Sequence, residues 1–158
     1  MTYVFETIQE AETLAFAKLL GERVQPGDVI LLEGDLGSGK TAFTKGLAKG
    51  MGINQIIKSP TYTLIREYTK GRLPLYHLDV YRLEEAGGEG LGLEEYFYGK
   101  GVSVVEWSKF ISEDLPTTYL LIEINKVGEE MERRRFTVQA LGERYEKLLL
   151  DWKDVNEN

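Results

Sequence analysis

The chain has 158 residues, of which 42% are hydrophobic and 28% are charged, and this composition suits one globular domain with a single core. Its formal net charge of −7 argues against independent DNA or RNA binding, because such binding needs a basic surface. The absence of cysteine excludes disulfides and thiolate metal sites, and no apolar run is long enough to span a membrane. We therefore expect a cytoplasmic protein with neither DNA nor a membrane as its partner, since its first residues also lack a signal-peptide pattern.

The first third of the chain reads as two strand–helix units. A short strand is predicted from Tyr3 to Glu6, and a helix from Thr7 to about Arg23, where Thr7 and Glu10 have the spacing of a capping box. Val29 to Leu32 form a continuous apolar run, which is typical of a buried parallel strand. A glycine-rich loop follows, and a second helix is expected from Lys40 to about Met51.

The rest of the chain predicts a hairpin, three further strands and a closing helix. The hairpin pairs residues 62–68 with 73–81 across a four-residue turn, and an acidic, glycine-rich stretch at 84–98 predicts short helices and a mobile segment. The remaining predicted elements are strands Val102–Val105, Tyr119–Asn125 and Phe136–Ala140, helix Gly142–Trp152 and a flexible tail at 153–158. The expected fold class is α/β: one P-loop domain over residues 1–158, with three α/β/α layers and a mixed sheet.

The glycine-rich loop carries the most specific signal in the sequence. Residues Gly34 to Thr41 match G-x-x-x-x-G-K-[ST], between an apolar strand and a helix. Glycine lets the backbone curl so that its N–H groups converge on phosphate, and the helix N-terminus favours the anion. Lys40 is expected on the β- and γ-phosphates and the Thr41 hydroxyl on Mg²⁺. The loop therefore predicts binding of a magnesium nucleotide.

Two acidic residues end apolar strands and are candidates for the chemistry. Asp79 and Glu106 could each hold the metal ion or orient the attacking water. The single histidine, His77, lies within a predicted strand among aromatic residues, and a structural role is expected for it. Trp107 is expected to pack, although its place beside Glu106 leaves a role near the nucleotide open. Three consecutive arginines at 133–135 are interpreted as a solvated turn or strand edge.

The sequence favours ATP over GTP. Asn125-Lys126-Val127-Gly128 has glycine where a guanine-binding N-K-x-D motif needs aspartate, and no D-x-x-G switch follows the loop. A small-molecule kinase is the other enzyme class to weigh. The chain is short for the separate lid that such a kinase would need.

Four motifs in this order resemble the bacterial TsaE (YjeE) family. They are the loop at 34–41, Ser59-Pro60-Thr61-Tyr62-Thr63, His77-Leu78-Asp79-Val80-Tyr81-Arg82 and Val105-Glu106-Trp107. The resemblance spans about Phe5 to Ser108. It implies an ATPase for threonylcarbamoyladenosine in tRNA, which works with TsaB and TsaD and resets their complex between turnovers. It also implies that tRNA is met only through that complex. A nucleotide-gated binding module, for which hydrolysis is incidental, remains the alternative.

The resemblance also implies roles for individual residues. Thr41 and Glu106 would hold Mg²⁺, Asp79 would orient water or the metal's ligands, and Glu10 would lie near the adenine unless it only caps its helix. Ala42 stands where many members have threonine, so only a backbone contact to the α-phosphate would remain there. The implied nucleotide contacts are Glu10, Asp35, Gly37, Ser38, Gly39, Lys40, Thr41 and Ala42, and the implied γ-phosphate switch is Ser59, Pro60, Thr61 and Tyr62.

Overall fold

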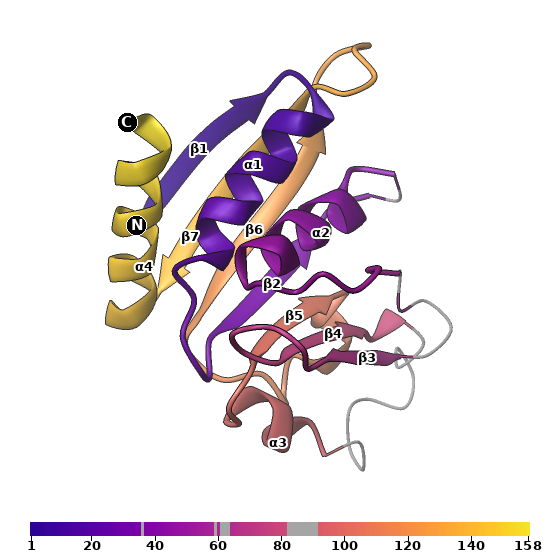
Figure 1. The fold of residues 1–158 in the computed structure, drawn as a ribbon, viewed down its shortest axis with the longest axis vertical. Helices are drawn as coiled ribbons and strands as arrows, with labels where there is room; N and C mark the ends of the chain where they lie inside the picture. The colour runs from indigo at the N-terminus through magenta and orange to yellow at the C-terminus, as the bar shows by residue number, and fades with distance from the viewer. Residues whose placement is uncertain (36, 59, 61–63, 82–91) are drawn as a thin grey trace.

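A seven-stranded mixed sheet forms the centre of the protein (Figure 1). The computed structural model describes residues 1–158 except 36, 59, 61–63 and 82–91. The strand order is β1-β7-β6-β2-β5-β4-β3, in which β6, β2, β5 and β4 are parallel neighbours and the outer pairs are antiparallel. The elements are β1 Thr2–Thr7, α1 Glu10–Gly21, β2 Val29–Glu33, α2 Lys40–Gly50, β3 Ile65–Tyr68, β4 Leu75–Asp79, α3 Leu93–Phe97, β5 Val102–Glu106, η2 Ser108–Ile111, β6 Tyr119–Lys126, β7 Arg134–Leu141 and α4 Glu143–Glu157.

Helices cover both faces of the sheet, which confirms the expected three layers. Strand β2 shows why: Ile30 and Leu32 belong to a core cluster with residues of α1, α2 and α4, while Val29 and Leu31 belong to a second cluster with residues of α3 and η2. A strand that is buried on both faces is apolar at every position rather than at alternate ones. The continuous apolar run in the sequence is therefore the mark of the central strand.

Glycines bring α1 and α2 into close contact. A β-carbon on Gly46 of α2 would lie 2.5 Å from the Leu14 carbonyl oxygen of α1, and one on Gly50 would lie 2.1 Å from that of Lys18. No other residue type fits at these contacts without displacing a helix. The pairs Leu14–Gly46 and Lys18–Gly50 also show that the two helices run parallel. Their N-termini, at Glu10 and Lys40, consequently lie at the same end of the molecule.

The capping box predicted at the start of α1 is wrong. Thr7 is the last residue of β1, and its hydroxyl lies 2.7 Å from that of Thr13, so it cannot cap the helix. The helix begins at Glu10 after Gln9, with no side-chain capping hydrogen bond. A buried hydroxyl pair between strand and helix therefore competes successfully with a local cap.

The other boundaries agree more closely with the predictions. The antiparallel hairpin is confirmed as β3 and β4. In the stretch at 84–98, the structure describes the short helix α3, while residues 84–91 lie outside the described residues. The closing helix α4 continues to Glu157, so residues 153–157, expected as a flexible tail, are helical.

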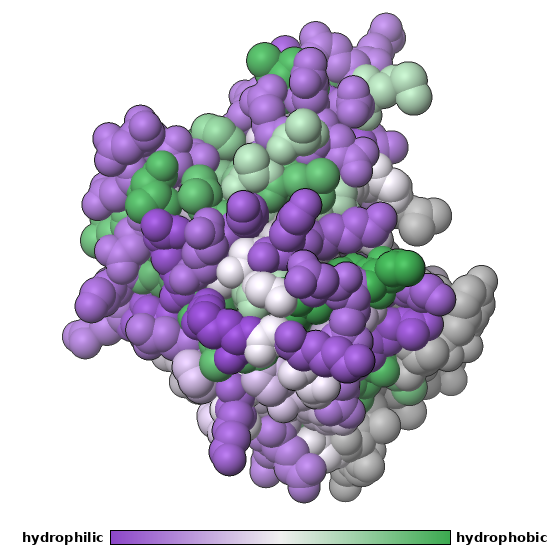
Figure 2. All heavy atoms as spheres, in the orientation of Figure 1, coloured by the Kyte–Doolittle hydropathy of each residue, from purple (hydrophilic) through white to green (hydrophobic). Residues whose placement is uncertain are grey.

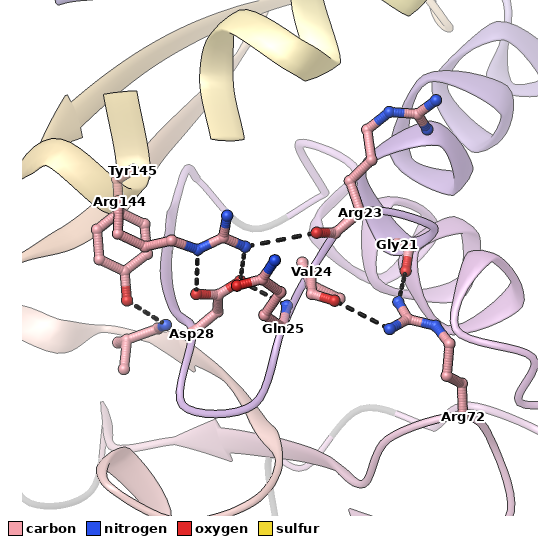
Figure 3. Close-up of polar contacts among 9 residues, drawn as sticks. Gly21, Arg23, Val24, Gln25, Asp28, Arg72, Arg144 and Tyr145 are labelled. Carbon is pink, nitrogen blue, oxygen red and sulfur yellow. Dashed lines mark hydrogen bonds and ion pairs between the residues drawn. The ribbon is translucent and has the colours of Figure 1, made fainter. Parts of the chain in front are cut away.

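A half-buried ion pair ties the turn between α1 and β2 to α4 (Figure 3). Asp28, 3% exposed, accepts hydrogen bonds from Arg144 Nη2 at 2.6 Å and Nε at 3.0 Å, and another from the Gln25 N–H at 2.7 Å. Next to it, the Tyr145 hydroxyl accepts the Val29 N–H at 2.8 Å. These contacts fix where β2 starts, and so where the loop at its other end lies.

The surface is mostly polar. Figure 2 shows hydrophilic side chains over most of the face that carries α1 and α2, with apolar side chains in smaller groups. Within the described part of the chain, no helix has the length and apolar character needed to cross a membrane.

Arg144→Ala should lower the free energy of unfolding by about 2 kcal/mol, because it leaves the Asp28 carboxylate buried without its cation. Lys147→Ala removes an equal charge from an exposed position of the same helix and should change it by less than about 0.5 kcal/mol. Urea unfolding of both variants measures the difference. Equal effects would show that the ion pair does not stabilise the fold.

Candidate functional site

Parallel strands bring the predicted site residues to one edge of the sheet. Leu32 of β2 lies opposite Glu106 of β5, and Glu106 lies opposite Asp79 of β4. The loop at 34–39 leaves β2 at this edge. Clefts at the carboxyl ends of parallel strands are the usual ligand sites of open α/β sheets. The two acidic side chains and the glycine-rich loop are thus neighbours, although up to 72 positions separate them in the sequence (106 − 34).

The loop has the backbone conformation that its glycines predict. Gly39, which precedes α2, has φ of +108°, and the Ser38 N–H donates to the Asp35 carbonyl at 3.0 Å, which closes a turn. A β-carbon on Gly34 would lie 2.5 Å from Ser38 Oγ. The loop therefore curls tightly over the N-terminus of α2. This end of an 11-residue helix presents N–H groups that attract an anion.

Glu106 connects the loop lysine to the sheet. One carboxylate oxygen lies 3.5 Å from Lys40 Nζ and the other lies 2.6 Å from Nε2 of His77, which is fully buried. Burial raises the pKa of Glu106, but the hydrogen bond and charge of His77, with a smaller effect of Lys40, hold that pKa below its ordinary value of 4.5. Glu106 is therefore ionised near neutral pH and can only accept, so His77 Nε2 carries the proton between them. His77 is thus buried in its strand, as expected, and its side chain holds a candidate catalytic group in place.

Asp79 is held beside Glu106 through its backbone. Its N–H donates to the Leu64 carbonyl at 2.8 Å, and its carboxylate Oδ1 accepts the Tyr81 N–H at 3.1 Å. The residue is only 6% exposed. Oδ1 thus fixes the orientation of the Asp79 carboxylate, while Oδ2 has no hydrogen bond to the described residues.

Aromatic side chains form one wall of the site. The Trp107 ring lies 4.7 Å from Lys40 Nζ, which gives a cation–π contact, and Tyr81 packs edge-on against the same ring. Trp107 has φ of +62°, an uncommon value for a bulky residue. Such a conformation is retained only where surrounding contacts enforce it, and it is frequent at functional sites. Trp107 therefore lies against the reactive end of the loop lysine as well as packing.

These residues surround a cleft of about 640 Å³, large enough for a nucleotide. Its lining consists of Glu10, Gly37, Gly39, Lys40, Thr41, Asp79, Tyr81, Glu106, Trp107 and Arg134. A smaller adjacent hollow of about 50 Å³ is lined by Ala42 together with Glu10, Thr13, Gly39, Glu132 and Arg134. Glu10 thus lies at the predicted site even though its capping role is wrong.

Three predicted residues within the described part of the chain line neither the cleft nor the smaller hollow: Asp35, Ser38 and Pro60. Asp35 is exposed on the loop, and Ser38 is buried behind it with no hydrogen-bond partner for its Oγ among the described residues. In the predicted switch, Pro60 is buried and its carbonyl accepts the Leu64 N–H at 3.0 Å. Ser59, Thr61 and Tyr62 lie outside the described residues.

Arg134 is the functional candidate that the sequence analysis missed. Instead of a solvated strand edge, it lies at the start of β7 and donates from Nε to the Ser38 carbonyl at 2.6 Å. The contact joins positions 96 residues apart. Only the antiparallel pairing of β6 and β7, which places Lys126 opposite Arg134 at the loop, could have indicated it.

A magnesium ion would find suitable donors in this cleft. The Thr41 hydroxyl and the carboxylates of Asp79 and Glu106 are oxygen ligands of the kind that Mg²⁺ prefers. Among the described residues, no group of three His, Cys, Asp or Glu could hold a metal ion by itself. Mg²⁺ in nucleotide sites commonly uses one or two carboxylates and keeps other positions for substrate and water.

Comparisons with known proteins point to one family. The sequence model described as "Threonylcarbamoyl adenosine biosynthesis protein TsaE" matches residues 7–136. The chain is 53% identical to the tRNA threonylcarbamoyladenosine biosynthesis protein TsaE of Bacillus subtilis over 144 residues, which is 91% of this chain and 89% of that protein. It is 47% identical to the Nostoc protein of the same name over 138 residues, 85% and 83% of the two chains. A crystal structure of Bacillus subtilis YdiB matches with a TM-score of 0.87 at 45% identity, covering 100% of this chain and 97% of that one.

Replacing His77 should raise the pKa of Glu106. In His77→Leu the effect of burial is no longer offset by the largest opposing contact, so the pKa of the Glu106 carboxyl should rise above its wild-type value. Lys40→Met should raise this pKa less, because Lys40 has the smaller effect. Carboxyl-carbon NMR titration of the three proteins measures the order. A wild-type midpoint above 4.5 would contradict the arrangement described here.

Proposed function

Because the chain belongs to the TsaE family of tRNA threonylcarbamoyladenosine biosynthesis, we propose that it binds and hydrolyses Mg-ATP to support repeated turnover in that pathway. The observation that carries the proposal is the meeting of the glycine-rich loop, Lys40, Asp79 and Glu106 around one cleft. Phosphoryl transfer to water needs positioning and positive charge at the phosphates, and a carboxylate near the attacking water or the metal. The cleft contains groups of each kind.

The glycine-rich loop and the start of α2 would bind the phosphates. The N–H groups at the start of α2 and the Lys40 ammonium would hold the β- and γ-phosphates. In the unliganded protein, Lys40 is already placed by the Glu106 carboxylate and the Trp107 ring. Little side-chain entropy is therefore lost when it meets phosphate.

The two carboxylates serve the hydrolytic step. When bound, Mg²⁺ would neutralise the charge that develops on the phosphate oxygens. Thr41 and Glu106 would be its protein ligands, and Asp79, which also lines the cleft, would orient the water or the metal-bound waters. His77 keeps Glu106 ionised and in place throughout.

The base would lie toward α1. Glu10, the first residue of α1, lines both the main cleft and the small hollow next to Ala42. We place the adenine near Glu10, with the Ala42 backbone near the α-phosphate. The absence of an N-K-x-D aspartate at Gly128 supports ATP over GTP.

The partners fit the charge of the chain. A protein of net charge −7 is repelled by tRNA, so tRNA would be met through the TsaB and TsaD proteins of this pathway rather than directly.

A specific observation also favours the alternative, a nucleotide-gated binder. Glu106 contacts Lys40 in the free protein, so a phosphate bound by Lys40 would compete with that contact before any hydrolysis. The two functions differ in whether hydrolysis is required for repeated rounds of modification.

Lys40→Ala should weaken Mg-ATP binding by at least about tenfold and abolish hydrolysis, because it removes the charge nearest the β- and γ-phosphates. Lys45→Ala, on the exposed face of the same helix, is the matched control and should bind and hydrolyse ATP like the wild type. Calorimetry and phosphate release measure the two quantities. Unchanged affinity in Lys40→Ala would overturn the site assignment.

A further inference from the structure

Three consecutive arginines lie at the start of β7, where Arg133 precedes the strand and Arg134 and Arg135 begin it. They have different partners. Arg133 forms ion pairs with Glu6 at 3.1 Å and Glu130 at 3.7 Å, and Arg135 forms one with Glu6 at 3.6 Å. Among the described residues, no carboxylate lies within ion-pair distance of Arg134. Its hydrogen bonds all go to backbone carbonyl oxygens. The charge of Arg134, unlike that of its two neighbours, is therefore not offset by an ion pair within the described residues. Arg134 also lines the cleft.

The guanidinium joins the phosphate loop to the turn before β7. On the loop side, Nε donates to the Ser38 carbonyl at 2.6 Å and Nη2 lies 3.4 Å from the Gly37 carbonyl. On the other side, Nη1 donates to the carbonyls of Met131 at 2.8 Å and Arg133 at 2.9 Å. A side chain that is fixed at both ends in this way is itself rigid, because its rotamer is determined by its acceptors.

Holding the Ser38 carbonyl fixes the next amide. In a planar trans peptide the C=O and the following N–H point in opposite directions. The short bond from Arg134 to the Ser38 oxygen thus directs the Gly39 N–H to the opposite side of the loop. Gly39 has no side chain that could hold this peptide plane. Its φ is +108°, and a glycine could adopt many other φ values at this position.

A second cation lies beside it. Lys126 is the cross-strand neighbour of Arg134, and a β-carbon on Gly37 would lie 3.5 Å from its Nζ. The salt bridges recorded for the described residues do not include Lys126 either. Lys40 pairs with Glu106 at 3.5 Å, whereas Arg134 and Lys126 supply positive charge at the loop without an ion pair to any carboxylate in the described part of the chain.

We propose that Arg134 is a positioning residue of the nucleotide site, which sets the peptide planes of residues 37–39 for phosphate while Lys126 adds to the local positive charge. This inference rests on the proposed function, since it assumes that a nucleotide phosphate occupies the loop. It assigns the β6–β7 hairpin, far from the glycine-rich motif in sequence, to the phosphate-binding apparatus.

The test compares Arg134→Ala and Arg134→Lys with Arg135→Ala as matched control. Arg135 has the same charge, lies next in the chain and pairs with Glu6 away from the loop. Calorimetry with Mg-ATP and with Mg-ADP should show affinities about tenfold weaker in Arg134→Ala for both nucleotides, because both place phosphate in the loop. Arg134→Lys should remain within about threefold of Arg134→Ala, because an ammonium lacks the planar fork. Arg135→Ala should bind like the wild type.

Two further readouts separate positioning from a general structural effect. In Arg134→Ala the KM for ATP should rise by a larger factor than kcat falls, because the variant loses phosphate positioning but retains the groups proposed for chemistry. In nitrogen-15 NMR spectra of the free protein, the Gly39 amide should shift or broaden in both Arg134 variants, while amides of β5 stay unchanged. Changes spread over β5 as well would indicate a folding defect and overturn a positioning role.

The outcomes are distinguishable from failure of the proposed function. If the wild type bound neither nucleotide, the proposed function would fail, and the Gly39 amide would still report on Arg134 in the free protein. Wild-type nucleotide affinity in Arg134→Ala, or full recovery in Arg134→Lys, would overturn the proposal while leaving ATP binding intact. Full recovery would assign Arg134 a purely electrostatic effect.

Discussion

The buried carboxylate of Glu106 is the constraint on which the site depends. It is 6% exposed, and burial of a charge is costly unless the charge is paired and hydrogen-bonded. Both partners are present: His77 from β4 and Lys40 from the first turn of α2. Removing either would leave an under-compensated charge inside the protein. The pairing therefore locks β4, β5 and α2 in one relative position, and it orders the loop lysine before any ligand arrives.

The framework around this carboxylate is built to hold α2 steady. Glycines let α1 and α2 pack in contact, and the Asp28–Arg144 pair fixes the start of β2 against α4. On the opposite side, Arg72 donates to the carbonyls of Val24 and Gly21 at the end of α1 (Figure 3). These contacts lie away from the cleft, yet they set the helix axis along which the loop N–H groups point. A site that acts by positioning requires such rigid support.

The parts of the site that could be read from the sequence are those with a local signature. Gly34 to Thr41 is a contiguous motif, and Asp79 and Glu106 each end an apolar run, so parallel pairing predicts that they meet. The capping box failed because Thr7 finds a buried partner in Thr13, which no short-range pattern indicates. Arg134 was missed for a similar reason. Its role depends on a contact across 96 positions, and in the sequence it is indistinguishable from its two carboxylate-paired neighbours.

In the function we propose, the Glu106 charge serves hydrolysis rather than ATP binding, and hydrolysis drives repeated tRNA modification. Glu106→Gln keeps the shape and one acceptor oxygen but removes the charge, and Glu123→Gln, at an exposed position of β6, is its matched control. With TsaB, TsaD, ATP and tRNA, we expect near wild-type ATP affinity for Glu106→Gln, hydrolysis slower by about a hundredfold, and a stall after about one modification cycle. Many cycles of modification by a Glu106→Gln protein that no longer hydrolyses ATP would contradict it.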